Sequence, residues 1–136
     1  MTIESDTDVR DVLSHETIAV VGCSSTPGKA AHDVPAYLHD RGYDVVPVNP
    51  FADEIFERSA PDTLAAVEEE IDVVCIFRPS DEVAGIVDEA LEREDVRAIW
   101  TQQGIRDDEA AERAVTDGRT VVQDRCMKVE HRRLVA

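Results

Sequence analysis

The stretch from Thr17 to His32 constrains the fold more than any other part of the chain. Residues 18–21 form a short apolar run that stops at Gly22, which is typical of a strand buried on both faces of a parallel sheet. Small, hydroxyl-bearing or turn-forming residues follow, and a helix is expected from near His32 to Arg41, closed by Gly42. A strand, a small-residue loop and a helix gather backbone N–H groups and the positive end of a helix dipole, which suits a phosphate or pyrophosphate.

Two common nucleotide motifs do not fit this loop. The dinucleotide fingerprint G-x-G-x-x-G would need glycine where Ser24 and Pro27 stand. The P-loop also fails, because Gly22 and Gly28 are one residue too far apart and Lys29 is followed by alanine rather than by serine or threonine. The loop therefore disfavours a nicotinamide or flavin site and excludes P-loop hydrolysis. A tight turn without any ligand stays open as an alternative.

Apolar runs and helical patterns alternate along the rest of the chain, which predicts an α/β fold. We expect one Rossmann-like, doubly wound parallel sheet of about five strands with helices on both faces, forming a single domain over residues 1–136. Residues 1–16 would contribute an N-terminal helix, and residues 51–59 would be a loop. The expected strands are 18–21, 44–48, 71–77, 98–101 and 120–123, the expected helices are 6–14, 32–41, 61–70, 80–91 and 107–115, and a basic tail ends the chain.

Ligands of such folds bind beyond the carboxyl ends of the strands. The sequence places four loops there: 22–29, 49–50, 77–79 and 103–104. Their charged members, Lys29 and Arg78, are both basic. Asn49 follows the second strand, where NAD-binding domains carry an acid for the ribose, and this is a second departure from the dinucleotide pattern.

The chain is strongly acidic, with 30 Asp and Glu against 14 Lys and Arg and a net charge of −16. This charge argues against nucleic acid or an anionic membrane as a partner. The only lysines are Lys29 and Lys128, a composition typical of salt-adapted cytoplasmic proteins, although an ordinary acidic protein is the alternative. There is no signal-peptide pattern and no apolar run of membrane length, so we expect a cytoplasmic location.

The cysteines and histidines do not suggest a metal centre. Cys23, Cys75 and Cys126 are odd in number and lack C-x-x-C spacing, which disfavours a disulfide framework and zinc, and the four histidines are scattered. Cys75 lies in a predicted strand and is expected to be a small core residue. A thiol redox regulator stays open, because Cys23 would lie at a helix N-terminus beside Lys29, an environment that lowers a thiol pKa.

Four segments in this order carry a family resemblance: VVGCSSTPGKAAHDVPAYLHDRGYDVVPVNP, VVCIFRPSDEV, IWTQQGIRDDEAAERA and VVQDRCMKVEHRRL. Together they resemble the stand-alone CoA-binding proteins, which are Rossmann-like domains related to the CoA-binding domain of succinyl-CoA synthetase alpha subunits. The resemblance extends from Thr17 to Leu134. It departs at residues 101–103, where the family usually has a hydrophobic residue before the glycine.

The resemblance implies a CoA or acyl-CoA ligand and a set of residues to hold it. Phosphates would lie at Gly22, Ser24, Ser25 and Lys29, with Cys23 and His32 beside them. The nucleotide would be bordered by Asn49 and Pro50, the ligand would lie against Phe77 and Arg78, and Gln103 and Gly104 would line the same cleft.

No catalytic constellation comes with this resemblance, because the synthetase carries its phosphohistidine in a later domain. A CoA-binding carrier, sensor or partner module, with a protein partner or a second copy of the chain, is therefore the expected function. The alternatives are an NAD(P)-binding oxidoreductase-like domain and a thiol regulator that uses Cys23 or Cys126.

Overall fold

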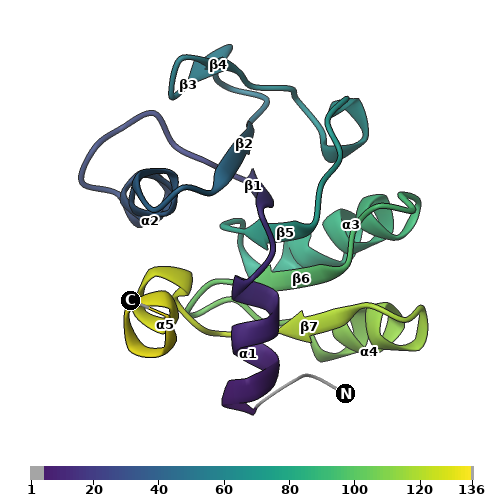
Figure 1. Cartoon of the computed structure of the whole chain (residues 1–136). Helices are drawn as coiled ribbons and strands as arrows, with labels where there is room; N and C mark the ends of the chain where they lie inside the picture. Colours follow the sequence, from purple (N-terminus) through teal and green to yellow (C-terminus); the bar gives the residue numbers. More distant parts are fainter. Residues whose placement is uncertain (1–4, 136) are drawn as a thin grey trace.

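Five parallel strands form the central sheet of the computed structural model, which describes residues 5–135 (Figure 1). The strands are β1 (Thr17–Val21), β2 (Asp44–Val48), β5 (Val73–Ile76), β6 (Ala98–Thr101) and β7 (Thr120–Val122). Their order is β2-β1-β5-β6-β7, and each neighbouring pair is parallel. The predicted doubly wound α/β sheet is confirmed.

Helices cover both faces of this sheet. They are α1 (Asp6–Leu13), α2 (Ala30–Asp40), α3 (Ser80–Leu91), α4 (Asp108–Thr116) and α5 (Met127–Leu134). Figure 1 shows α2 and α5 on one side of the sheet and α3 and α4 on the other, and α1 packs against α5. The predicted N-terminal helix is therefore present, while residues 1–4 of the predicted segment lie outside the described residues.

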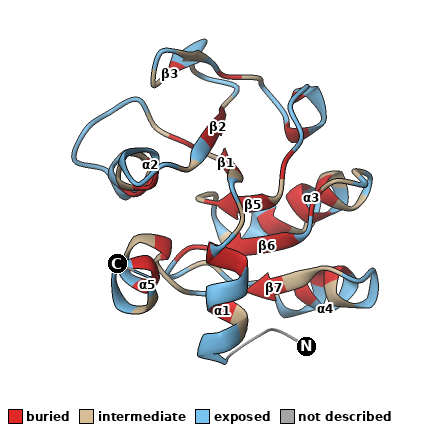
Figure 2. Cartoon of the chain, in the orientation of Figure 1, coloured by how far each residue is buried: buried red, intermediate tan, exposed pale blue. Residues whose placement is uncertain are grey.

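Two apolar layers hold the helices to the sheet, as the buried positions in Figure 2 show. Alternate strand residues point to opposite faces. Ile18, Val20 and Trp100 pack with α1, α2 and α5, whereas Ala19 and Ile99 pack with α3 and α4. Because both faces are covered, the strands read as continuous apolar runs in the sequence.

Strand β2 runs through Pro47, although a proline cannot donate a hydrogen bond to a neighbouring strand. The strand lies at the edge of the sheet and pairs only with β1, with Pro47 opposite Val20. A proline without an N–H donor is tolerated at an edge, because no second neighbour needs that hydrogen bond.

The predicted loop at 51–59 contains a small hairpin, formed by β3 (Glu54–Ile55) and β4 (Arg58–Ser59). Phe56 and Glu57 make its turn with φ of 55° and 60°. Such turns usually carry Asn or Gly, so the sequence lacked the usual signal. Arg58 ties the hairpin down through ion pairs with Asp44 and Glu69.

Two further predictions were wrong, one for the segment after Pro61 and one for the C-terminal segment. The helix expected from Pro61 is only a 3-10 turn, η1 (Leu64–Ala66). The expected basic tail is helix α5, which buries Met127, Glu130 and His131. Its charged sequence concealed it, because Glu130 is buried with ion pairs to Arg125 and Arg133 rather than exposed.

Candidate functional site

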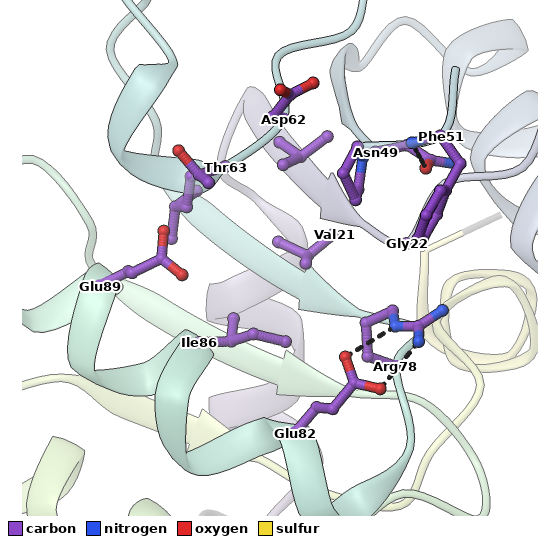
Figure 3. A pocket seen from close by; sticks show the side chains of 13 residues that line it. Val21, Gly22, Asn49, Phe51, Asp62, Thr63, Arg78, Glu82, Ile86 and Glu89 are labelled. Atoms are coloured by element: carbon purple, nitrogen blue, oxygen red, sulfur yellow. Dashed lines mark hydrogen bonds and ion pairs between the residues drawn. The ribbon is translucent and has the colours of Figure 1, made fainter.

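A pocket of about 340 Å³ opens at the carboxyl ends of β1, β2 and β5, between these strands, η1 and α3 (Figure 3). Four of the predicted site residues line it: Gly22, Asn49, Pro50 and Arg78. The remaining lining residues are Val21, Val48, Phe51, Asp62, Thr63, Leu64, Glu82, Ile86 and Glu89. The pocket therefore joins loops that are far apart in the sequence.

Gly22 ends β1 in a position that only glycine suits. Its φ is +87°, and its N–H donates to the Val48 carbonyl oxygen at 2.9 Å. A Cβ at this position would lie 2.8 Å from Cδ of Arg78 and 3.2 Å from its Cγ. The absence of a side chain at Gly22 thus lets the aliphatic part of Arg78 lie across the end of β1.

The Arg78 guanidinium is held by Glu82, one turn further along in α3. Nε donates to Oε1 of Glu82 at 3.0 Å and Nη2 donates to Oε2 at 2.7 Å. These hydrogen bonds raise the pKa of Arg78 and lower the pKa of Glu82. Arg78 therefore faces the pocket as an ion pair rather than as a free cation.

Asn49 connects the loops that follow β1 and β2. Its Nδ2 donates to the Cys23 carbonyl oxygen at 2.8 Å, and its Oδ1 accepts from the Phe51 N–H at 2.7 Å. The second bond forms an Asx turn that leaves the Phe51 side chain 88% exposed at the pocket. Asn49 thus positions the pocket wall, a role that an acidic residue without N–H donors could not fill.

The wall opposite Arg78 is acidic and fixed in place. Figure 3 shows Asp62 and Glu89 on the side away from Arg78. The segment that carries this wall is held by Arg93, which donates to the carbonyl oxygens of Leu64 at 3.1 Å and Val67 at 2.9 Å. Sequence reasoning missed this wall, because it expected a helix after Pro61, where the structure has only a 3-10 turn.

The small-residue loop lies beside the pocket and is joined to α2. That helix begins at Ala30, earlier than predicted, so Pro35 falls inside it. Because Pro35 has no N–H, the Ala31 carbonyl lacks its helical partner and instead accepts from the Ser24 N–H at 2.9 Å. Ser24 Oγ in turn accepts from the Thr26 N–H at 3.0 Å. The proline therefore helps to shape the loop that was predicted to hold phosphate.

A carboxylate already occupies part of the α2 N-terminus. Asp33 Oδ1 accepts from the Gly28 N–H at 3.1 Å and lies 3.1 Å from Nδ1 of His32. These contacts lower the pKa of Asp33, the His32 contact most. Ser25 and Lys29 are exposed in this loop, and Lys29 makes no side-chain cap bond to the helix. The loop keeps its cation accessible, while the N–H groups of Ser24, Thr26 and Gly28 are bonded internally.

Cys23 does not have the environment of a reactive thiolate. Its side chain is fully buried, and this burial raises its pKa to about 12. The lowered pKa expected from the helix N-terminus is therefore contradicted. Cys75 is also buried, as expected for a core residue, and Cys126 is partly buried.

The other predicted site residues lie outside this pocket. Phe77 packs into the apolar layer that faces α2 and α5, so it points away from its neighbour Arg78. Gln103 is exposed, and the Gly104 N–H donates to Oδ1 of Asp124 at 2.6 Å. The neighbouring Gln102 is buried instead and accepts from the Met127 N–H at 3.0 Å.

Ser80 connects α3 to another segment. Pro79 is the N-cap residue of α3, and Ser80 lies inside the first turn. Its Oγ accepts from the Arg106 N–H at 2.9 Å. Ser80 therefore joins α3 to the loop after β6.

Residues 5–135 contain neither a candidate metal centre nor a candidate membrane-spanning helix. No group of three or more His, Cys, Asp or Glu side chains in this part of the chain is arranged to hold a metal ion. Over the same residues, no helix is both long enough and apolar enough to cross a membrane.

Similarity to known proteins agrees with this geometry. A protein of Bacillus subtilis described as uncharacterised, YneT, is 38% identical over 128 residues, covering 93% of this chain and 94% of its own length. The solved structure of a hypothetical protein from Pyrococcus horikoshii superposes with a TM-score of 0.92 at 32% identity, covering 100% of this chain and 97% of that one.

An ADP-forming acetate–CoA ligase of Archaeoglobus fulgidus is 27% identical over 103 residues. The match covers 74% of this chain but only 15% of the ligase, so the chain corresponds to a small part of that enzyme. Residues 16–132 match the family described as the CoA binding domain. With most of its length in this match, the chain belongs to the CoA-binding domain family.

Proposed function

We propose that this chain binds CoA or an acyl-CoA at the pocket and acts as a carrier, sensor or partner module rather than as a catalyst. The observation that carries the proposal is the meeting of Gly22, Asn49-Pro50 and Arg78 around one pocket in a CoA-binding domain. The nucleotide would lie over these residues, with its phosphates between Arg78 on one side and Ser24, Ser25, Lys29 and His32 on the other. Cys23, Phe77, Gln103 and Gly104 stay predictions from the family resemblance.

The alternatives have less support. An NAD site would need an acid after β2 to accept from the ribose hydroxyls, but Asn49 stands there and is bonded to Cys23 and Phe51. A thiol regulator at Cys23 would need an accessible thiolate, whereas this thiol is buried with a raised pKa.

A ligand screen tests the proposal. Thermal melts at high potassium chloride with CoA, acetyl-CoA, NAD, NADP and ATP should show the largest stabilisation by CoA or acetyl-CoA, because a ligand that binds only the native state raises its stability. Equal or larger stabilisation by NAD would refute the proposal. Isothermal titration of the best ligand then gives its affinity.

We also propose a cytoplasmic, salt-adapted protein, on the basis of the net charge of −16. Unscreened carboxylates repel one another more strongly as the Debye length grows, so the melting temperature should fall when potassium chloride is removed. A melting temperature independent of salt would refute the salt adaptation. A protein partner or a second copy of the chain as partner is part of the same proposal.

A further inference from the structure

The pair formed by Arg78 and Glu82 is the feature of the pocket that the proposed function leaves unexplained. Arg78 is the only cation among the residues that line the pocket, whereas Asp62, Glu82 and Glu89 are acidic. The one group able to attract an anion is thus already bonded through two nitrogens to a carboxylate of the same wall. The pair is partly exposed, with 41% of the Arg78 side chain and 46% of the Glu82 side chain accessible.

The position of this ion pair is set by the fold. The aliphatic part of Arg78 is confined above Gly22, where a Cβ would come within 2.8 Å. Glu82 lies one turn into α3, so the helix holds its carboxylate beside the guanidinium. A ligand anion therefore reaches Arg78 only by taking the place of a carboxylate that is tethered close to it at high effective concentration.

We infer that Glu82 is a specificity-determining residue of this pocket. Its carboxylate stays paired with Arg78 in the presence of weak anions and is displaced by a polyanionic, phosphate-bearing ligand. The inference rests on the proposed function. A tethered carboxylate outcompetes a free carboxylate or sulfate of similar chemistry, but a pyrophosphate brings more charge and more acceptor oxygens to the same guanidinium. The acids Asp62 and Glu89 on the opposite wall disfavour an anion elsewhere in the pocket (Figure 3).

The chain offers a matched control on the same helix. Asp88 also lies in α3 and pairs with an arginine, Arg113 of α4, but neither residue lines the pocket. Asp88→Asn removes the same charge from the same helix as Glu82→Gln. A difference between the two variants therefore reports the contact with Arg78 and not the net charge.

Titration calorimetry at constant potassium chloride tests the inference with CoA and with pantetheine, which has no phosphate. Glu82→Gln should tighten CoA about two- to fivefold, the change expected when an exposed ion pair no longer competes. Pantetheine binding should not change, Asp88→Asn should bind CoA like wild type, and Glu82→Gln should have no effect when Arg78→Ala is also present. Unchanged or weaker CoA binding by Glu82→Gln would overturn the inference, because Glu82 would then be a bystander or a ligand contact.

A sulfate arm keeps this test separate from the test of CoA binding. Sodium sulfate should raise the melting temperature of Glu82→Gln more than that of wild type or Asp88→Asn, because a released Arg78 accepts a small anion. Equal shifts in all three proteins would overturn the inference. If wild type failed to bind CoA, the proposed function would be refuted, and the sulfate comparison would still decide the role of Glu82.

Discussion

The carboxyl edge of the sheet has two halves that differ in what their polar groups do. The open half, at the ends of β1, β2 and β5, surrounds a pocket of about 340 Å³. The closed half, at the ends of β6 and β7, is filled by its own hydrogen bonds. Thr101 Oγ1 donates to the Ile105 carbonyl oxygen and accepts from the Asp124 N–H, while Asp124 accepts from the Gly104 N–H.

This difference shows that a strand end is not enough to make a site. Gln123 and Gln102 also bond inward in the closed half, to the N–H groups of Asp107 and Met127. Polar groups that satisfy one another stabilise the loops and leave little for a ligand. In the open half the main polar contact, between Arg78 and Glu82, is exposed enough to be exchanged.

The largest effect is expected for a substitution beneath the closed half. Trp100 is fully buried, and its indole N–H donates to the Arg125 carbonyl oxygen at 2.7 Å. Trp100→Ala should lower the free energy of unfolding by about 3–5 kcal/mol, measured by urea denaturation, because it leaves a large cavity. Trp100→Phe should cost less. A loss below about 1 kcal/mol for Trp100→Ala would show that the closed half is not the rigid part of the edge.

In the open half, substitutions should change binding and not folding. Arg78→Ala or Lys29→Ala should each weaken CoA by about ten- to a hundredfold, which corresponds to a charge-assisted contact of about 1.5–3 kcal/mol. The free energy of unfolding should change by less than about 0.5 kcal/mol, because both side chains are accessible. Arg113→Ala is the control. Unchanged CoA affinity in both variants would place the ligand elsewhere.

Helix α5 should make folding stability depend on pH. His131 is buried against the Tyr37 and Tyr43 rings, and its Nδ1 lies 2.8 Å from the Tyr37 hydroxyl. Burial, with the nearby charge of Arg41, lowers its pKa below the ordinary 6.5. Its contribution to stability is therefore present above pH 6.5 and is lost as the pH falls from 6.5 through the lowered pKa.

Urea denaturation between pH 7 and about 5 measures this contribution before most carboxylates are protonated. His131→Gln should show a shallower loss of stability over this range than wild type. If wild type and His131→Gln lost equal stability over this pH range, the contribution of His131 would not depend on a neutral imidazole.

The smallest effect is expected at Gln103, where the family resemblance and the comparison of the two halves disagree. Gln103 is exposed in the closed half and does not line the pocket. Gln103→Ala should therefore change CoA affinity by less than about twofold, as is usual for an exposed side chain. A tenfold loss of CoA affinity, measured by titration calorimetry, would indicate that the ligand reaches the closed half and would support the family resemblance.

The local sequence determined the elements that bury an apolar face. The five strands were predicted because runs such as residues 18–21 and 73–76 are apolar without interruption. The loops at the strand ends, with Gly22, Asn49 and Arg78, followed from the same pattern. The hairpin after β2 and helix α5 were missed, because they are stabilised by ion pairs to other segments. Arg58 pairs with Asp44 and Glu69, and Arg133 of α5 pairs with Asp6 of α1.

Only the tertiary structure decided which strand ends form a pocket. The sequence placed Arg78 and Gly104 equally at the carboxyl edge, but contacts with other segments distinguish them. Gly22, at the end of β1, leaves space for Arg78 to lie at the pocket, whereas Asp124 bonds to the Gly104 amide. A local pattern specifies where a chain turns, because backbone preferences are local. Which polar groups stay available to a ligand depends on contacts that form when distant segments pack together.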